Sequence, residues 1–311
     1  MITLLKNVSL KKHSHYQIGG PAKYFFELKD SNELEELFET IKNFNGPIFV
    51  MASGTNILFR DEGFNGLVIK VKNQFIKKEN GFWRVGAGTS MSEILNYTIL
   101  NSLSGLEWAG GLPGSLGGAI FGNAGAFGGE IKDVIVETIS WDFSQKMPNF
   151  IKRKNNECQF FYRSSIFKTR PQEIILEAKL KLEKGETIKI KKSIQEKINY
   201  RKTHQPLEYP SAGSVFKNVA LEKIPQMWLD FVKPAVKNDP FPLVPAAYLI
   251  DAVGLKGESR GGAMISPKHP NFIVNFSNAR AADVLSLIEL VKEKVFKKFN
   301  VLLEEEIIIL K

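Results

Sequence analysis

The stretch Trp108–Glu130, WAGGLPGSLGGAIFGNAGAFGGE, carries no formal charge before its last residue. In length it is comparable to a membrane span, since roughly 18 apolar residues can cross a bilayer. Glycine and proline interrupt it, however, and they are the weakest helix formers. Clustered glycines indicate a backbone with positive φ angles, or one that another group approaches too closely for a Cβ. Two interpretations are open at this point: a loop whose exposed amides cradle a phosphate, or a set of tight turns.

The composition of the chain is that of a globular protein with a substantial core. Of its 311 residues, 43% are hydrophobic and 24% are charged, and this length is enough for two or three domains. The first residues contain no apolar segment long enough for a secretory signal. The single cysteine, Cys158, excludes an intramolecular disulfide. We therefore expect a cytoplasmic protein that does not insert into a membrane.

The net charge of +9 is spread along the chain. A nucleic-acid-binding segment would combine clustered basic residues with aromatic ones. No such segment stands out, so we expect no nucleic-acid partner; a basic surface also suits small ligands rich in phosphate. The four histidines lie far apart, and no cysteine or histidine pair has zinc spacing. We expect no metal site.

Residues 1–72 are expected to form a first domain that begins with a βαβ pattern. Tyr24–Leu28 is predicted to be a strand, and apolar residues at helical spacing predict a helix over 31–41. Ile48–Ala52 is a short apolar strand. The polar loop Ser53–Asn56 follows it, at the end of the strand where α/β sheets tend to bind ligands.

Residues 73–200 are expected to form a second domain that contains the glycine run. Ser90 and Glu93 have the spacing of a capping box and predict a helix through about Leu100. Further strands are predicted at 134–141 and 173–182, and a charged helix at 186–200.

Residues 201–311 are expected to form a third domain. Pro210–Asn218, PSAGSVFKN, is predicted to be a turn that leads into a strand. Apolar residues from Ala281 onward lie on one helical face, and Asn300 stands where a left-handed cap would be. LLEEEIIIL is predicted to close the chain as a strand. The piece 219–245 shows no evident chemical role.

Six fragments, in order along the chain, resemble one known family, the UDP-N-acetylenolpyruvoylglucosamine reductases. A single short glycine motif recurs by chance, and context must confirm it. The resemblance extends from about residue 13 to the C-terminus. The short distance from the fourth fragment to the third domain is similar to the branch of the family without the extra substrate-clamping loop. The fragments are QIGGPA (Gln17–Ala22), ASGTN (Ala52–Asn56), GLPGSLGGAIFGNAGAFGGEI (Gly111–Ile131), YRSSIFK (Tyr162–Lys168), PSAGSVFKN (Pro210–Asn218) and the terminal EEEI.

The resemblance implies an α+β flavoenzyme of bacterial peptidoglycan synthesis. Its two-subdomain FAD-binding fold, of the vanillyl-alcohol oxidase type, would be followed by a smaller α+β substrate-binding domain. Such an enzyme takes hydride from NADPH onto noncovalently bound FAD. It then reduces UDP-N-acetylglucosamine enolpyruvate to UDP-N-acetylmuramate. NADPH and this nucleotide sugar are the expected partners, and we expect a monomer.

The same resemblance favours the ligand-cradling interpretation of the glycine run. FAD contains a diphosphate, and amides from 114–118 and 123–125 can donate to its oxygens while the neutral wall keeps the flavin site dry. Ala52 stands where the family prefers glycine. The expected cofactor contacts are Gly54, Thr55 and Asn56 in the polar loop, and Gly114, Ser115, Gly117, Gly118, Asn123, Ala124 and Gly125 in the run.

Three residues are expected, by the resemblance, to carry the chemistry. Hydride addition to the terminal methylene leaves negative charge at the α carbon, which needs a proton, while the carboxylate beside it needs a cation or an acid. Ser214 would donate the proton, and the planar guanidinium of Arg163 would pair with the carboxylate. Glu306 would act as a protonated acid or through Arg163. Glu304, on the same face of an extended strand, is the alternative.

Tyr162, Lys217 and Asn218 are expected to contact the substrate, the last two near its diphosphate. Two other functions are open from the sequence. The first is another FAD-dependent oxidoreductase on the same fold, which would not need Ser214 or Glu306. The second is a flavin-binding or nucleotide-sugar-binding protein that does not turn over. The sequence does not decide between NADPH and NADH.

Overall fold

The computed structural model describes residues 2–144 and 147–310. It divides into two compact units, each assembled from separate stretches of the chain and each with its own hydrophobic core. The polar loop predicted to bind the cofactor contributes Gly54 to unit 1 and Thr55 to unit 2. Unit 1 comprises Met1–Val8, Ala22–Gly54 and Asn65–Tyr200, and unit 2 comprises Ser9–Pro21, Thr55–Phe64 and Arg201–Lys311.

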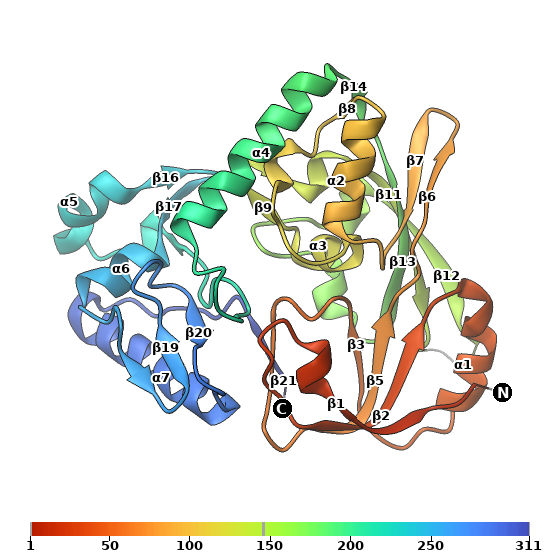
Figure 1. The fold of residues 1–311 in the computed structure, drawn as a ribbon, viewed down its shortest axis with the longest axis horizontal. Coiled ribbons are helices and arrows are strands. Elements are labelled where there is room, and N and C mark those ends of the chain that lie inside the picture. Colours follow the sequence, from red (N-terminus) through yellow and green to blue (C-terminus); the bar gives the residue numbers. More distant parts are fainter. Residues whose placement is uncertain (1, 145–146, 311) are drawn as a thin grey trace. The chain divides into compact units, whose positions relative to one another are not determined.

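The first sheet of unit 1 has four strands in the order β1-β2-β5-β3 (Figure 1). Helix α1 (Leu34–Ile41) lies between β2 and β3 in the chain, and β3 and β5 run parallel. The predicted order of strand, helix and strand is therefore confirmed. The strands are β1 (Leu5–Ser9), β2 (Pro21–Leu28), β3 (Ile48–Met51) and β5 (Phe64–Val71).

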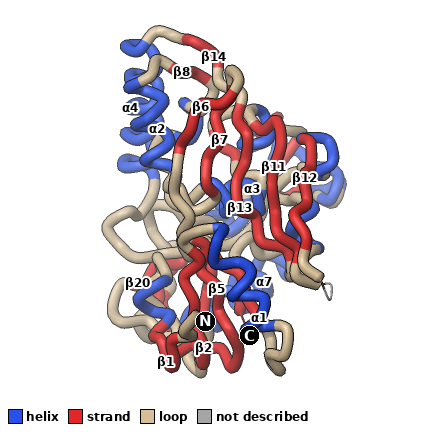
Figure 2. The backbone as a smooth tube through the Cα atoms, turned by 90° about the vertical axis from the view of Figure 1, so that its right-hand side faces the viewer, coloured by secondary structure: helices blue, strands red, loops and turns tan. Residues whose placement is uncertain are grey.

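The second sheet of unit 1 is antiparallel and has the order β12-β11-β13-β7-β6 (Figure 2). The predicted boundary at residue 72 falls between β5 and β6, and a division into subdomains there stays a prediction. Strands β8 (Leu103–Ser104) and β14 (Glu183–Lys184) form a separate, two-stranded antiparallel sheet in unit 1. The strands are β6 (Ile76–Glu79), β7 (Phe82–Gly86), β11 (Ile135–Asp142), β12 (Asn149–Lys154) and β13 (Glu173–Leu180).

Besides α1, helices α2, α3 and α4 belong wholly or largely to unit 1. Helix α2 (Met91–Leu100) begins as predicted, because the Ser90 hydroxyl accepts a hydrogen bond from the Glu93 amide. Helix α3 (Leu116–Gly122) packs against β13 and β7. Helix α4 (Thr187–His204) is the predicted charged helix, and its last residues belong to unit 2.

The glycine run folds into several short elements. After a 3-10 turn at Glu107–Ala109 come α3 and a hairpin of β9 (Gly125–Ala126) and β10 (Gly129–Glu130). A helix forms in spite of the glycines, because burial of apolar side chains such as Leu116 and Ile120 outweighs poor helix propensity.

Both predicted reasons for glycine occur within the run. Gly114 has a φ of +109°, a conformation that other residues rarely adopt. Gly129 is needed because of close approach: a Cβ there would lie 2.4 Å from Cδ1 of the buried Trp108. The run is therefore a place where backbone packs directly on side chains.

Unit 2 is organised around the long helix α7 (Ala281–Phe299), which packs on a sheet of order β18-β19-β20 (Figure 1). Asn300 ends the helix with a φ of +54°, as predicted. The strands are β18 (Ser259–Arg260), β19 (Ala263–Ile265) and β20 (Ile273–Asn275). The predicted apolar face, Val284, Leu287, Ile288, Val291 and Val295, is buried throughout.

The piece 219–245 forms a small sheet of order β15-β17-β16 with the short helix α5 (Leu229–Val232). Helix α6 (Ala246–Ala252) follows it. The sheet consists of β15 (Val219–Ala220), β16 (Lys237–Asn238) and β17 (Pro242–Val244).

The predicted closing strand is shorter than expected. Only β21 (Ile308–Leu310) is a strand, and it pairs in parallel with β4 (Ile57–Phe59). Glu305 forms an isolated bridge with Phe216, and a bend at Ile307 separates this bridge from β21. The chain changes partner at the bend, so a continuous strand over LLEEEIIIL was wrong.

Within residues 2–144 and 147–310, no helix is long and apolar enough to cross a membrane. The same residues contain no group of three or more His, Cys, Asp or Glu side chains arranged to hold a metal ion.

Gly129→Ala tests the close approach in the glycine run. The added Cβ would overlap the Trp108 ring, and such overpacking costs about 1–3 kcal/mol. Urea unfolding should show this loss. Gly122→Ala is the control, because a Cβ at Gly122 meets no atom within 4 Å. Equal unfolding midpoints for the two variants would contradict the packing argument.

Candidate functional site

Ser115 occupies the N-cap position of helix α3, but its side chain makes no capping hydrogen bond. The residue is buried, with 2% of its surface exposed. Its Oγ is buried without a hydrogen-bond partner among the described residues. A buried hydroxyl left in this state costs about 1–3 kcal/mol, which a ligand that bonds to it would recover.

Main-chain amides beside Ser115 divide into two groups. The Leu116 amide donates to Thr89 O (3.0 Å) and the Gly117 amide donates to Ala87 O (2.8 Å), so both are used inside unit 1. The Ser115 and Gly118 amides donate to no backbone acceptor in the described part of the chain. Gly118 also leaves space, because its added Cβ would meet only Ala52 Cβ, at 3.5 Å. These features fit a ligand that approaches the backbone.

Asn123 and Ala124 are used within the fold. The Asn123 amide closes the end of α3, and the Ala124 amide donates to Ala119 O at 2.8 Å. The Asn123 side chain, fully buried, donates to Phe161 O and accepts from the Lys132 amide. Both amides were expected to donate to a diphosphate, and both already have acceptors at the helix terminus. Contact through other atoms stays a prediction.

Arg163 lies over the hairpin that follows α3. Its Nη2 donates to Gly125 O at 2.9 Å, and its guanidinium carbon is 5.0 Å from the centre of the Tyr162 ring. Gly125 permits this placement: a Cβ there would lie 2.7 Å from Glu130 Cγ and 3.4 Å from Arg163 Nη1. Three predicted site residues, Arg163, Tyr162 and Gly125, are thus brought together in unit 1.

Two buried polar atoms of the run were not singled out from the sequence. Trp108 Nε1 and Glu130 Oε1 have no hydrogen-bond partner among the described residues, and both residues are buried, each with 7% of its surface exposed. The other carboxylate oxygen of Glu130 pairs with Lys132 Nζ at 2.5 Å. The only sequence signal for Glu130 was its place as the first charge after the neutral run.

Ser214 and Glu306 are brought together in unit 2. The Glu306 amide donates to Val215 O at 2.7 Å, and the Lys217 amide donates to Glu304 O at 2.9 Å. Gly213, with a φ of +78°, makes the turn that precedes the half-buried Ser214. Two predicted catalytic residues therefore lie on adjacent, hydrogen-bonded segments.

Asn56 also belongs to this arrangement. Its Nδ2 donates to Glu306 O at 3.0 Å, and its own carbonyl accepts from the Ile308 amide at 2.9 Å. Asn56 was expected to contact the cofactor, and in the structure its amide nitrogen binds the C-terminal segment. A cofactor contact by Gly54, Thr55 or Asn56 stays a prediction.

Glu304, the alternative to Glu306, is bound by two lysines. Its oxygens lie 3.1 Å from Lys223 Nζ and 3.3 Å from Lys217 Nζ. The hydrogen bonds from Lys223 and Lys217 lower the pKa of the Glu304 carboxyl, which therefore stays ionised at neutral pH. Glu304 is unsuited to act as an acid.

The candidate substrate residues of unit 2 also have partners in the fold. Lys217 pairs with Glu304, and the Asn218 Oδ1 accepts from the Ala246 amide at the start of α6 (3.2 Å). The Lys217 side chain is 31% exposed, which leaves it accessible to a ligand.

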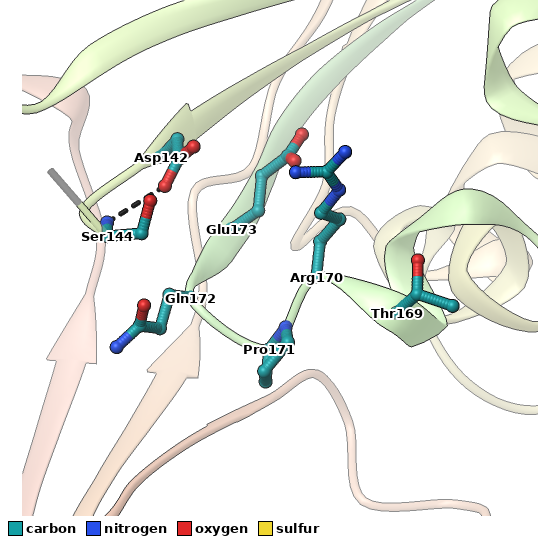
Figure 3. Close-up of a pocket in the computed structure, with 7 residues that line it drawn as sticks. All are labelled: Asp142, Ser144, Thr169, Arg170, Pro171, Gln172 and Glu173. Atoms are coloured by element: carbon teal, nitrogen blue, oxygen red, sulfur yellow. Dashed lines mark hydrogen bonds between the residues drawn. The ribbon is translucent and has the colours of Figure 1, made fainter.

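A small polar pocket lies elsewhere in unit 1, where β11 ends and β13 begins (Figure 3). The Ser144 amide donates to Asp142 Oδ1 (2.8 Å) at its edge. The Glu173 carboxylate is engaged by Arg153 and Ser140. None of the seven lining residues, Asp142, Ser144, Thr169, Arg170, Pro171, Gln172 and Glu173, was predicted to be functional.

The Ser115 hydroxyl and the Ser115 and Gly118 amides are called the cradle here. Ser115→Ala tests whether the cradle binds FAD. Removal of the unpartnered hydroxyl should raise the unfolding free energy of the flavin-free protein by about 1 kcal/mol. FAD affinity, measured by flavin fluorescence titration, should fall about tenfold, because the variant cannot hydrogen-bond the cofactor.

Ser165→Ala is the matched control for that experiment. Ser165 is also buried (3% exposed), but its Oγ donates to Phe121 O at 2.8 Å. This variant should lose stability, by about 1 kcal/mol, and keep its FAD affinity. Unchanged FAD affinity in the Ser115 variant would count against the cradle.

Two family models match the chain. The model of an FAD binding domain matches residues 22–141, which include the whole glycine run. The model of the UDP-N-acetylenolpyruvoylglucosamine reductase C-terminal domain matches residues 205–310, which include Ser214 and Glu306. The predicted combination of an FAD-binding α+β fold with a further C-terminal domain is therefore confirmed.

Whole-chain relatives agree with these matches. A UDP-N-acetylenolpyruvoylglucosamine reductase from Caldanaerobacter subterraneus is 38% identical over 98% of this chain and 92% of its own length. That of Clostridium tetani is 39% identical, over 98% and 91%. The crystal structure of the reductase from Thermus caldophilus covers both chains completely, at 31% identity and a TM-score of 0.77. The chain therefore belongs to the UDP-N-acetylenolpyruvoylglucosamine reductase family, the FAD-dependent oxidoreductases of peptidoglycan synthesis.

Proposed function

We propose that this chain reduces UDP-N-acetylglucosamine enolpyruvate to UDP-N-acetylmuramate, with NADPH as the hydride donor. The observation that carries the proposal is the pairing of the Ser214 and Glu306 segments through the hydrogen bond from the Glu306 amide to Val215 O. This pairing matters because a proton donor and an acid must act on one small group of the substrate.

FAD, when bound, supplies the hydride transfer from NADPH to the terminal methylene of the substrate. The residues that would hold it are those of the cradle, with the Ser115 hydroxyl and the Ser115 and Gly118 amides as donors. The neutral side chains of the run exclude competing charges and water from the reaction.

Ser214 donates the proton to the substrate's α carbon. An alcohol is a weak acid, but a carbon with developing negative charge is a strong base, so placement decides whether transfer occurs. Ser214 follows the turn at Gly213 and precedes the buried residues Val215 and Phe216, which hold its backbone firmly.

Arg163 pairs with the carboxylate of the enolpyruvyl group. Its bond to Gly125 O and its contact with the Tyr162 ring hold the guanidinium, whose planar fork matches the geometry of a carboxylate. The positive charge stabilises the negative charge that develops when hydride arrives.

Glu306 is the acid that assists at this carboxylate. Glu304 suits that role less well, because its hydrogen bonds with Lys217 and Lys223 favour the ionised carboxylate. The backbone of Glu306 is held on both sides. Its amide donates to Val215 O and its carbonyl accepts from Asn56 Nδ2, which fixes the direction of the segment.

Tyr162, Lys217 and Asn218 complete the proposal as substrate-binding residues, with Lys217 at the diphosphate. The basic sequence, with a net charge of +9, favours an anionic nucleotide sugar. We further propose that the chain acts in the cytoplasm as a monomer.

Ser214→Ala separates the two halves of the reaction. Bleaching of the flavin absorbance by NADPH should keep the wild-type rate, because no proton from Ser214 is needed. Return of the absorbance on addition of UDP-N-acetylglucosamine enolpyruvate, without oxygen, should slow by about 10²–10⁴-fold.

Ser211→Ala is the control for this variant. Ser211 lies in the same PSAGS segment, and its Oγ accepts a weak bond from the Gly213 amide (3.4 Å). It should behave as the wild type in both halves. A Ser214 variant that returns the absorbance at the wild-type rate would remove this residue from the mechanism.

A further inference from the structure

Asn271 forms hydrogen bonds with the backbone of the two residues that follow Ser214. It is 3% exposed, and it lies just before β20. Its Nδ2 donates to Phe216 O at 2.8 Å, while its Oδ1 accepts from the Phe216 amide at 2.9 Å. The Val215 amide donates to the Asn271 main-chain carbonyl at 2.8 Å.

These three bonds place Val215 and Phe216 between two neighbours. Asn271 binds one edge of this segment, and the C-terminal segment binds the other edge through the Glu306 amide and Val215 O (2.7 Å). The backbone of Val215 is therefore bonded on both sides, and Ser214 is its immediate neighbour in the chain. The side chain of Asn271 binds Phe216, and Val215 connects Phe216 both to Ser214 along the chain and to Glu306 through a hydrogen bond.

Asparagine is suited to this double contact. A side-chain amide offers a donor and an acceptor side by side, which matches the amide and carbonyl of one extended residue. Aspartate has a similar shape but, when ionised, only accepts hydrogen bonds. It would face the Phe216 carbonyl with a second oxygen, and this edge of the segment would move away.

We propose that Asn271 is a positioning residue for the reduction, which holds the Ser214 hydroxyl in place for proton transfer through the Val215–Phe216 backbone. This inference rests on the proposed function of Ser214. Asn271 acts through the backbone and is not a catalytic residue. Its loss should lower the rate of the proton-dependent half of the reaction more than it lowers substrate binding, since a misplacement of about 1 Å can cost about 100-fold in rate.

Asn275 provides a matched control within the same strand region. It is also buried (8% exposed) and also uses both ends of its amide on backbone groups. Its Nδ2 donates to Tyr16 O at 3.1 Å, and its Oδ1 accepts from the Ala279 amide at 2.8 Å. These contacts hold other parts of unit 2, so a general loss of packing would appear equally in both variants.

The experiment compares Asn271→Asp and Asn275→Asp as FAD-loaded holoenzymes. Flavin bleaching by NADPH and the oxygen-free return of absorbance with UDP-N-acetylglucosamine enolpyruvate are each followed over a range of concentrations. We expect Asn271→Asp to keep the bleaching rate and the half-saturating substrate concentration, while the maximal rate of return falls by about 10- to 100-fold. Asn275→Asp should keep all three values, even where its melting temperature falls.

Asn271→Ser serves as a second variant if the aspartate variant does not fold. Serine removes both side-chain contacts with Phe216 without adding a charge, and the same fall in the maximal return rate is expected. If either folded Asn271 variant returns absorbance at the wild-type rate, or if the Asn275 variant slows equally, the positioning role is overturned. If the wild type itself fails to return absorbance with this substrate, the proposed function is overturned, and the inference falls with it.

Discussion

The structure of unit 1 depends on glycine backbone that packs directly against neighbouring side chains, with no Cβ in between. At Gly129 the backbone lies against the buried Trp108 ring, and at Gly125 it lies where the Arg163 and Glu130 side chains meet. A methyl group at either position would overlap its neighbour. Because these contacts leave no room for a Cβ, the neutral glycine run sets where Arg163 lies, and with it one charge of the candidate site.

The polar groups of the run are not all satisfied by the fold. Ser115 Oγ, Trp108 Nε1 and Glu130 Oε1 are buried without partners in the part of the chain described, and such groups are costly unless something binds them. In unit 2, the side-chain amides of Asn271 and Asn56 are instead hydrogen-bonded to the backbone of Phe216 and of Glu306. The first pattern suits a ligand-binding wall, and the second suits a rigid support for a proton donor.

Much of the candidate site could be predicted from the sequence, but the hydrogen bonds of its atoms could not. The glycine run, Arg163, Ser214 and Glu306 were identified from motifs, and Glu304 remained an alternative because both glutamates share a strand face. The lysine partners of Glu304, which the sequence does not reveal, are the reason why Glu306 is the one proposed as the acid. Asn271 was missed altogether, because nothing in the local sequence signals that its amide will bind Phe216, 55 residues earlier in the chain.

The sequence by itself determined the local elements and the family. Apolar spacing predicted α7 and its buried face, Asn300 predicted its end, and the ordered motifs predicted an FAD-binding fold with a separate C-terminal domain. Tertiary structure alone decided that residues 9–21 and 55–64 join unit 2, that the closing strand breaks at Ile307, and which amides stay open. The physical reason is range: propensity and periodicity act over a few residues, whereas hydrogen-bond partners far apart in the chain are chosen only when the folded chain brings them together.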